Sequence, residues 1–497
     1  MSSYLDIAST RPDRVAVLDP AGRSVTFGDL TRRVHQLAHA LRGLGLAEGD
    51  GIVAIVHNGI PYYELYLAAW ETGLYFTPVN YRSAADEIAY IVANSGARAV
   101  FADAEIAAST PLDVPDRFAI GGDVPGWLSY EDFGREQPVT PPPGPKAGQI
   151  MLYTSGTTGR PKGVRRPLTG EPPEISELQL AGLAGLGIPP GEGAHLVACP
   201  LYHAAPGTFS TGSLHLGHTL VLMDRFDAEE TLRLIEKHRI TETHLVPTMF
   251  HRMLRLPEET KARYDVSSLV SVLHGAAPCP REVKERMIAW FGPVLYEYYG
   301  ASEGLISTVD TAAWLEAPGT VGAPLPGVEV KVFDDDGNEV PAGTTGTIHY
   351  RSAQTNFTYH GDPDKTAANR IGDFVTVGDF GHVDAQGRVF LGDRRGDLIL
   401  SGGVNIYPAE IEGRLLAHPA VADAAVIGVP DDEWGERVLA LVQLSPGAVA
   451  GTDLVDELKT HCRTTLAGFK VPKEIEFREQ LPRTESGKLL RRTLKHG

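Results

Sequence analysis

The chain has 497 residues, of which 42% are hydrophobic and 22% are charged, and its formal net charge is −18. This length exceeds what a single hydrophobic core supports, so we expect two to four domains or subdomains. The negative charge argues against nucleic acids and anionic membrane surfaces as partners.

Cysteine use and the N-terminal segment indicate the compartment. Cys199, Cys279 and Cys462 are far apart and lack the spacing of a disulfide framework or a zinc site. The first residues contain no apolar signal core, and no stretch reaches 18 consecutive apolar residues. The sequence therefore predicts a cytoplasmic protein without stable membrane insertion.

Strands and helices alternate in the first half of the chain. Thr26 followed by Asp29 is typical of a helix N-cap with an acidic first turn, and apolar residues then recur at helical spacing. The further elements that we expect are a strand within 51–59, a helix within 62–73, a strand within 77–82, a helix over 85–94 and a strand within 97–103, and the alternation returns over 195–247. This order predicts a parallel sheet with helices on both faces.

The pattern changes after about Pro318. Residues 328–352 consist of short apolar runs joined by turn residues, which predicts an antiparallel sheet or a small β-barrel. The three aspartates Asp334–Asp336 fit either a metal site or a hairpin turn before Gly337. We expect the turn, because the pattern of a calcium-binding loop does not follow.

A smaller α+β unit is predicted at the C-terminal end, with two strands within 421–444 and a helix within 452–466. Charged residues and a glycine at 393–397 separate this unit from the strands before it. The predicted fold class is therefore α/β. We expect a large N-terminal domain of doubly wound sheets plus a small β-barrel over 1–393, a hinge at 394–397, and a small, mobile α+β domain over 398–497.

The segment SGTTGRPKG, from Ser155 to Gly163, combines glycines and hydroxyls with one lysine and contains almost nothing that packs into a core. Backbone N–H groups freed by glycines form, together with hydroxyls, a concave surface of donors for phosphate oxygens, and Lys162 adds a positive charge. The segment is not a Walker loop, because Lys162 precedes Gly163 rather than Ser or Thr. A disordered linker is the alternative, but the strand-like residues 148–154 favour a phosphate-binding loop.

Five further segments follow this loop in order. The six segments are YTSGTTGRPKGV (153–164), HGAAP (274–278), YEYYGASEG (296–304), VGDFG (377–381), GDRRGDLILSGGVNIYPAEIE (392–412) and LPRTESGKLLR (481–491). Together they resemble the signatures of the adenylate-forming superfamily, in its acyl-CoA synthetase or acid–CoA ligase branch. The resemblance implies an enzyme that converts a carboxylic acid and ATP to acyl-AMP with Mg²⁺, and then transfers the acyl group to coenzyme A.

The resemblance also implies which residues bind the nucleotide. The loop would hold the β- and γ-phosphates, the small residues after His274 would lie against adenine with Tyr299 as a stacking ring, and Asp379 would accept hydrogen bonds from the ribose hydroxyls. The implied nucleotide-binding residues are Thr154, Ser155, Gly156, Thr157, Thr158, Gly159, Lys162, Gly275, Ala276, Ala277, Glu297, Tyr298, Tyr299, Gly300, Ala301, Ser302, Asp379, Arg394 and Lys488.

Four residues are implied to be catalytic. Lys162 would neutralise phosphate charge, and Glu303 would be the Mg²⁺ ligand, since this hard cation prefers carboxylate oxygen. Arg394 would donate near the ribose and the phosphate. Lys488 would enter the site from the C-terminal domain and bridge the substrate carboxylate to ATP.

The residues implied for the acyl group and for coenzyme A lie elsewhere in the sequence. His203 resembles an aromatic gate of the acyl pocket, with a satisfied core histidine as the alternative, and the small residues Ala204 and Gly207 leave room for bulk. Gly402 and Gly403 resemble the loop along which the pantetheine chain passes.

The chain departs from the family pattern at two positions that bear on the mechanism. Val377 stands where threonine is usual, and Gly396, the implied hinge residue, stands where lysine or aspartate is common. Neither change removes a central catalytic group. They leave open whether both half-reactions run equally well.

The segments implied to line the acyl pocket, 202–218 and 246–253, are rich in apolar or small residues. We therefore expect an acid–CoA ligase for a hydrophobic acid, whether fatty, aromatic, or bulky alicyclic or terpenoid, in lipid or secondary metabolism. Its partners would be this acid, ATP and CoA, without nucleic acid, and a homodimer stays open. The alternatives are an enzyme that runs mainly one half-reaction or loads a carrier protein, and a nucleotide-binding sensor on an inactive scaffold.

Overall fold

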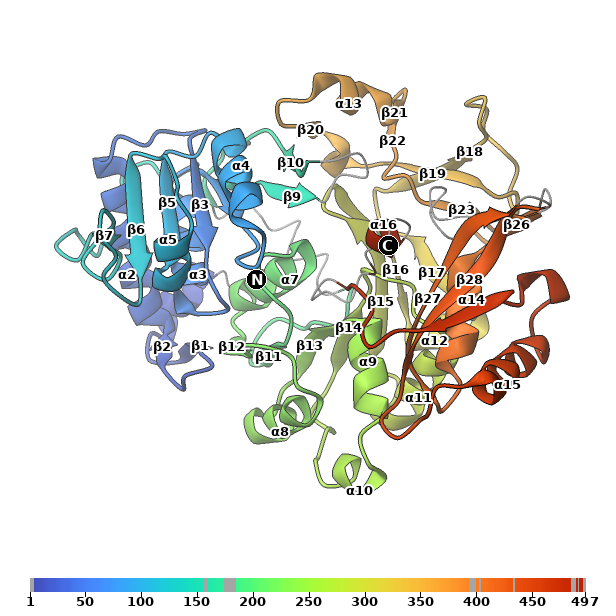
Figure 1. Cartoon of the computed structure of the whole chain (residues 1–497). Coiled ribbons are helices and arrows are strands. Elements are labelled where there is room, and N and C mark those ends of the chain that lie inside the picture. The colour runs from blue at the N-terminus through green and yellow to red at the C-terminus, as the bar shows by residue number, and fades with distance from the viewer. Residues whose placement is uncertain are drawn as a thin grey trace.

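The structure is a computed structural model that describes residues 4–154, 160–173, 185–392, 399–401, 404–431, 434–483, 489 and 491–494. A large body extends to residue 392, and a smaller unit follows from Ile399 (Figure 1). The predicted mixed α/β architecture, with a large N-terminal part built on sheets and a small C-terminal part, is confirmed. The hinge predicted at 394–397 lies outside the described residues and stays a prediction.

The first sheet is entirely parallel, with the strand order β7-β6-β5-β3-β4-β8. Its strands are β3 (Gly51–Ile55), β4 (Tyr75–Pro78), β5 (Ala99–Asp103), β6 (Asp116–Ile120), β7 (Leu128–Ser129) and β8 (Gln149–Ile150). The helices that accompany it are α1 (Tyr4–Thr10), α2 (Phe27–Gly43), α3 (Ile60–Glu71), α4 (Ala85–Ser95) and α5 (Ala104–Ser109). The elements predicted over residues 26–103 are present, but the strand predicted within 77–82 is β4, which begins at Tyr75 and ends at Pro78. Asp29 N donates to the Thr26 hydroxyl at 3.1 Å as an N-cap requires.

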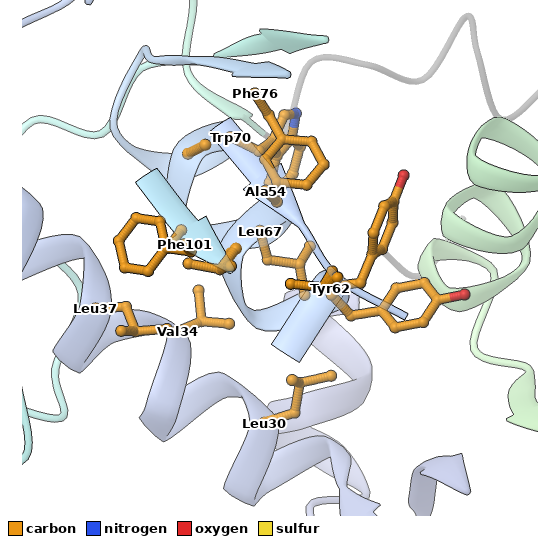
Figure 2. Close-up of a cluster of buried hydrophobic side chains, with 14 of the residues drawn as sticks. Leu30, Val34, Leu37, Ala54, Tyr62, Leu67, Trp70, Phe76 and Phe101 are labelled. Atoms are coloured by element: carbon orange, nitrogen blue, oxygen red, sulfur yellow. The ribbon is translucent and has the colours of Figure 1, made fainter. Parts of the chain in front are cut away.

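Side chains of successive strand residues enter two different cores, because they alternate between the faces of the sheet. Ala54 of β3 joins the cluster formed with α2 and α3, whereas Val53 and Ile55 pack on the face that α4 covers. Figure 2 shows the first of these clusters, in which apolar side chains of α2, α3 and the strands meet. Its labelled members are Leu30, Val34, Leu37, Ala54, Tyr62, Leu67, Trp70, Phe76 and Phe101.

The second sheet changes direction halfway along the strand order β2-β1-β12-β11-β13-β14-β15-β16-β17-β24-β23-β19-β22-β21, with β18 paired to β19. From β1 to β15 the strands are parallel, and they are β1 (Val15–Leu18), β11 (Ala194–Val197), β12 (Thr219–Leu222), β13 (Glu242–Leu245), β14 (Ser271–His274) and β15 (Leu295–Ala301), with β2 (Ser24–Thr26) antiparallel at the edge. The helices of this region are α7 (Ala204–His215), α8 (Ala228–His238), α9 (Pro247–Leu254), α10 (Glu258–Lys261), α11 (Arg281–Phe291) and α12 (Thr311–Glu316).

The antiparallel strands predicted after Pro318 are present and continue the second sheet. They are β17 (Thr320–Pro324), β18 (Glu329–Phe333), β19 (Gly346–Arg351), β21 (Arg370–Ile371), β22 (Phe374–Val375), β23 (Phe380–Val383) and β24 (Val389–Leu391), with the short helices η2 (Ala353–Thr355) and α13 (Pro363–Ala368) between them. A further antiparallel strand, β16 (Gly304–Asp310), lies before Pro318 and was not predicted. The predicted barrel region is therefore hydrogen-bonded to the parallel strands through β16 and β17. The aspartate run forms the predicted turn, because the Asp334 carboxylate accepts from Asp336 N and Asn338 N and Gly337 has φ +79°.

A third, three-stranded sheet has the order β20-β10-β9 and consists of β9 (Leu152–Thr154), β10 (Lys162–Arg165) and β20 (Thr358–Tyr359). The C-terminal unit contains β25 (Ile399–Ser401), β26 (Val404–Ile406), β27 (Val421–Asp431), β28 (Gly435–Leu444), β29 (Glu474–Phe477), α14 (Pro408–Leu416), α15 (Thr452–Arg463), η4 (Gly468–Lys470) and α16 (Arg491–Leu494). Its β27–β28 hairpin and α15 agree with the predicted α+β unit. In the described part of the chain, helices long and apolar enough to cross a membrane are absent.

Candidate active site

Lys162 begins the strand that follows the predicted phosphate loop. Strands β9 and β10 form an antiparallel pair in which Thr154 lies opposite Lys162. Lys162 Nζ lies 3.6 Å from Asp362 Oδ2 and 5.9 Å from the centre of the Tyr359 ring. The mostly buried Lys162 side chain is thereby held beside β20.

Glu303 lies in the tight connection between β15 and β16 and is only 6% exposed. The Tyr359 hydroxyl donates to Glu303 Oε1 at 2.7 Å, and Asn369 Nδ2 donates to the same hydroxyl at 3.1 Å. Burial, followed by the Glu303 charge, raises the pKa of Tyr359, so this hydroxyl stays a donor. Lys162 and Glu303, which are 141 positions apart in the sequence, thus meet on two sides of Tyr359.

The backbone of the Glu303 turn is fixed by a partly buried arginine. Arg166 Nη2 donates to the carbonyl oxygens of Ser302 at 3.0 Å and of Glu303 at 2.7 Å. The Arg166 carbonyl in turn accepts from the Tyr75 hydroxyl at 2.7 Å. Burial lowers the pKa of Arg166, and the nearby Tyr350 and Glu303 oppose that shift.

The segment predicted to contact adenine has an unusual backbone. Gly275 is buried, and a Cβ at this position would lie 2.6 Å from Tyr298 O and 2.7 Å from its ring, so only glycine fits. The next residue, Ala276, is exposed and has φ +64°, a conformation that is uncommon for a residue with a side chain. Such backbone strain clusters at ligand sites, which supports a functional role for this segment.

The side chains of the predicted site residues in β15 lie in different clusters, because alternate side chains point to opposite faces of the strand. Glu297 forms a buried ion pair with Lys284 at 2.6 Å. Tyr299 packs in the apolar cluster that contains Val164, whereas Tyr298 packs on the other face in the cluster of Phe209. The side chains of Glu297 and Tyr299 therefore serve the packing of the sheet, and a stacking role for Tyr299 stays a prediction.

Gly300 lies at an irregularity in the pairing of β15 with β16, which shifts register between Tyr299 and Gly300. A Cβ on Gly300 would lie 2.6 Å from Gly304 O, so the two strands approach closely there. Ala301 and Ser302 follow, and both are partly exposed at the start of the turn that carries Glu303. The bulge and the turn together aim this segment away from the regular ladder.

Asp379 precedes β23 and is positioned by β19. Asp379 O accepts from Ile348 N at 2.9 Å, and the Thr376 hydroxyl donates to Ile348 O at 2.8 Å. The charges of both Asp379 and Glu303 act on the pKa of Tyr350, which burial raises. Through its hydrogen bond to Ile348, Asp379 lies beside β19, the strand that also contains Tyr350.

The predicted acyl residues stand at the start of α7. His203 is the N-cap residue of this helix, and its ring lies 4.5 Å from that of Tyr202. Ala204 is partly exposed, whereas Gly207 is buried. A Cβ on Gly207 would lie 2.8 Å from Tyr62 Oη and 3.1 Å from Leu201 O, so this turn of the helix is closely packed.

Two family models match the sequence: the AMP-binding enzyme model over residues 6–360 and the AMP-binding enzyme C-terminal domain model over residues 410–488. The chain belongs to the AMP-binding enzymes. The predicted membership of the adenylate-forming superfamily, in its acid–CoA ligase branch, is confirmed. This AMP-binding enzyme is an adenylate-forming ligase.

Three similar proteins differ in what their names say they produce. A fatty acid–[acyl-carrier-protein] ligase, ScoC of Streptomyces coeruleorubidus, is 34% identical over 98% of this chain and 94% of its own length. A feruloyl-CoA synthase of Amycolatopsis sp is 34% identical over 95% and 93%. The structure of the amide bond synthetase McbA from Marinactinospora thermotolerans has a TM-score of 0.82 at 29% identity, over 97% of this chain and 96% of that chain.

Several predicted residues of this AMP-binding enzyme lie outside the described part of the chain, and their roles stay predictions. They are Ser155, Gly156, Thr157, Thr158, Gly159, Arg394, Gly396, Gly402, Gly403 and Lys488. Of the predicted residues that are described, the structure brings Lys162, Glu303 and Asp379 into one region through Tyr359 and Tyr350.

Four residues of this region were not predicted from the sequence: Arg166, Tyr350, Tyr359 and Asn369. Tyr350 and Tyr359 resemble ordinary core tyrosines in the sequence, and both are in fact buried. Arg166 follows the phosphate loop in an adjacent arginine pair, Arg165 and Arg166, in an otherwise acidic chain, and that pair was the available signal.

Proposed function

We propose that this enzyme activates a hydrophobic carboxylic acid with ATP and transfers the acyl group to the thiol of coenzyme A. The observation that carries the proposal is the meeting of Lys162 and Glu303 on two sides of Tyr359. A cation and a carboxylate that contact the same tyrosine, in a chain whose residues 155–159 are glycines and hydroxyl residues, suit a triphosphate and its counter-ion.

The first step needs charge neutralisation more than it needs a strong base. A carboxylate oxygen of the acid attacks the α-phosphorus of ATP, the bond to the β-phosphate oxygen breaks, and pyrophosphate leaves. Both reactants are anionic, so catalysis consists of screening their charges and aligning the attack. Lys162 screens the outer phosphates, and Lys488, which stays a prediction, bridges the carboxylate to ATP.

The residues around Glu303 fit a magnesium ion. One carboxylate oxygen accepts from Tyr359, and clusters of three or more metal-ligating His, Cys, Asp or Glu side chains are absent among the described residues. A single carboxylate that shares the ion with substrate phosphates is how Mg²⁺ is commonly bound. When bound, the ion supplies positive charge next to the phosphates.

Two further segments orient the nucleotide in this proposal. The exposed Ala276 backbone and the glycine before it let a flat base lie against the main chain. Asp379 accepts from the ribose hydroxyls, and Arg394 donates next to it. These groups fix the α-phosphorus relative to the acid, which is where alignment matters.

In the second step the thiol of coenzyme A attacks the acyl carbonyl carbon, the bond from that carbon to the AMP oxygen breaks, and AMP leaves. Gly402 and Gly403 would allow the thin pantetheine chain to pass close to the backbone. The similarity to the feruloyl-CoA synthase over 95% of the chain supports CoA as the acceptor.

The test is acyl-CoA formation, measured by mass spectrometry, with a panel of fatty, aromatic and alicyclic acids in the presence of ATP, Mg²⁺ and CoA. We expect one class to give its CoA thioester, and Lys162→Ala and Glu303→Gln each to lower the rate by about 10²–10³-fold. Lys146→Ala and Glu48→Gln are matched controls, because Lys146 and Glu48 form an exposed ion pair. If ATP binds but every acid fails to give acyl-AMP or acyl-CoA, the chain is a nucleotide-binding sensor and the proposal is wrong.

A carrier-protein thiol as acceptor is the second candidate, favoured by the 34% identity with ScoC over 98% of this chain. The same assay distinguishes the two when it offers CoA and a phosphopantetheinylated carrier protein in separate reactions. Acyl-AMP that forms at an equal rate in both, and is consumed only by the carrier protein, favours the second candidate.

A further inference from the structure

His244 occupies a position between two segments of the candidate site. It is the third residue of β13, and β13 pairs in parallel with β11 on one side and with β14 on the other. At their carboxyl ends these two neighbours lead to His203 and to Gly275, respectively. Because ligands of open α/β sheets bind at the carboxyl ends of the strands, His244 lies where the predicted acyl and adenine segments converge.

The surroundings of His244 are apolar and aromatic. Its ring centre lies 5.6 Å from that of Phe209 in α7 and 5.7 Å from that of Tyr298 in β15. Leu273 and Leu216 pack in the same cluster as these two rings. Burial lowers the pKa of His244 to about 3, with His195 and His203 adding to the shift, so the imidazole is neutral at physiological pH.

One nitrogen of this buried imidazole lacks a hydrogen-bond partner. His244 Nε2 lies 3.0 Å from the Tyr298 hydroxyl, whereas Nδ1 is buried and without a partner among the described residues. A buried polar atom in this condition destabilises the folded chain, because its hydrogen bond to water is lost and not replaced. A phenylalanine or leucine at this position would avoid that cost. Other buried histidines also have such an atom, among them His35 and His274, but the His244 ring lies beside both Phe209 of α7 and Tyr298 of β15.

We propose that His244, oriented by Tyr298, is a specificity-determining residue whose Nδ1 hydrogen-bonds a hydroxyl group on the hydrophobic body of the acid. This inference rests on the proposed function. It narrows the substrate class to hydroxylated hydrophobic acids and predicts weaker use of the same acids without the hydroxyl.

A hydroxyl is the group that suits this site in either tautomer. If Tyr298 donates to Nε2, then Nδ1 carries the proton and donates to the substrate oxygen. If Nε2–H donates to Tyr298, then Nδ1 accepts from the substrate O–H. A hydroxyl is both donor and acceptor, whereas a carbonyl or an ether serves only one of the two arrangements.

Tyr298 links the inferred contact to the nucleotide end. Its ring and carbonyl leave no room for a side chain on Gly275, and its hydroxyl contacts His244. The order of contacts from the adenine segment toward α7 is thus Gly275, Tyr298, His244 and Phe209. This order puts the hydroxyl on the body of the acid, away from the reacting carboxylate.

The experiment measures kcat/KM for acid-dependent pyrophosphate release with matched pairs of acids. The pairs are trans-cinnamic and 4-hydroxycinnamic acid, dodecanoic and 12-hydroxydodecanoic acid, and cyclohexanecarboxylic and 4-hydroxycyclohexanecarboxylic acid. We expect the wild type to prefer the hydroxylated member of at least one pair. His244→Phe should lower kcat/KM for that member by about 5- to 150-fold, the loss of one buried hydrogen bond, and leave the plain acid within about twofold.

Two further variants separate recognition from folding. His35→Phe replaces another buried histidine whose pKa is lowered by burial, one that lies in α2 and outside both segments implied to line the acyl pocket, and it should leave the preference unchanged. Tyr298→Phe removes the orienting hydroxyl and should weaken the preference by a smaller factor, and this variant serves if His244→Phe does not fold.

Equal losses on both members of every pair in His244→Phe would show that His244 is structural, and the inference would be wrong. A wild type that uses plain and hydroxylated acids equally would also overturn it while leaving the proposed function intact. If the wild type releases pyrophosphate with none of the six acids, both the inference and the proposed activity on these classes fail.

Discussion

The nucleotide end and the acyl end of the candidate site are stabilised in different ways. At the nucleotide end, Glu303 accepts from Tyr359, which Asn369 supports, and Arg166 holds the backbone of the turn. At the acyl end, Phe209 and Tyr298 pack among leucine and isoleucine side chains, and His244 keeps one nitrogen without a partner in the described structure.

This difference follows from what each end must do. The phosphate chemistry is the same for every substrate, so its groups can be fixed in advance by charged and hydrogen-bonded contacts. The acid varies between relatives, so that end needs shape and a small number of polar groups. Changes at the nucleotide end should therefore alter the rate for all acids, whereas changes at the acyl end should alter the choice among acids.

The largest effect is expected from Lys488→Ala, which tests the nucleotide end. Acyl-AMP formation should fall by about 10²–10³-fold, because a charged donor between the carboxylate and ATP is lost. Transfer of pre-made acyl-AMP to CoA should change little, and Lys473→Ala, at an exposed lysine, is the control. Equal loss of both steps, measured separately, would show that Lys488 acts throughout or is structural.

Gly207→Leu tests the acyl end. The new side chain meets Tyr62 Oη and Leu201 O at close range and must displace neighbours around the start of α7. Overpacking of this kind costs about 1–3 kcal/mol, so we expect KM for bulky acids to rise by ~10-fold or more and KM for short acids to rise much less. If only the KM of ATP changed, Gly207 would belong to the nucleotide end, and its assignment to the acyl end would be wrong.

Tyr359→Phe and Tyr350→Phe form a matched pair at the nucleotide end. The Tyr359 hydroxyl donates to Glu303, whereas the Tyr350 hydroxyl is buried and without a partner in the described structure. Losing the first should lower activity by about tenfold at subsaturating Mg²⁺ and raise the Mg²⁺ concentration for half-maximal rate. Loss of the Tyr350 hydroxyl should leave the Mg²⁺ concentration for half-maximal rate unchanged. An equal shift of this concentration in both variants would show that the contact between Tyr359 and Glu303 does not affect Mg²⁺ binding.

The smallest effect concerns a histidine behind the acyl end. The ring of His57 lies 3.9 Å from that of Tyr81, which in turn lies 5.5 Å from Tyr202. His57 Nδ1 contacts Asp103 Oδ2 at 2.6 Å, and this hydrogen bond, more than the nearby Glu105 and Asp224, raises the pKa of His57.

A histidine whose pKa is higher in the folded state than in the unfolded state stabilises the fold when it is protonated. This stabilisation is fully present below the unfolded-state pKa of about 6.5 and is lost as the pH rises through the higher folded-state pKa. Asp103→Asn should therefore lower the free energy of unfolding, measured by urea denaturation, more at pH 6 than at pH 8.5. The difference between the two pH values should be well under ~1 kcal/mol for this partly exposed pair. Glu105→Gln is the control with a weaker contact, 3.6 Å from His57. A larger loss at pH 8.5 would contradict the assignment.

Local patterns in the sequence predicted much of the fold. The N-cap at Thr26, the buried strand β3 and helices α3 and α4 depend on residues close in sequence, and each appears as expected. The junction of the predicted barrel with the parallel sheet depends on the pairing of β16 and β17 with distant strands. Periodicity does not encode such partners, so the continuity of the sheet could not be predicted.

The same limit applies to the candidate site. Lys162 and Glu303 each lie within a short motif that resembles the family pattern, so each residue can be identified from its own segment, but their proximity cannot. Tyr359 connects them only because β20 pairs with β10, a contact across almost 200 residues. The unpartnered nitrogen of His244 depends on every neighbour at once, and such an atom is visible only in the folded chain.

The most direct test of the central claim is exchange of labelled pyrophosphate into ATP by the wild type without CoA. The account predicts exchange that requires a hydrophobic acid and Mg²⁺ and that falls by about 10²–10³-fold in Glu303→Gln. Exchange that is absent with every acid, or that continues at the wild-type rate in Glu303→Gln, would contradict the claim that this site forms an acyl-AMP.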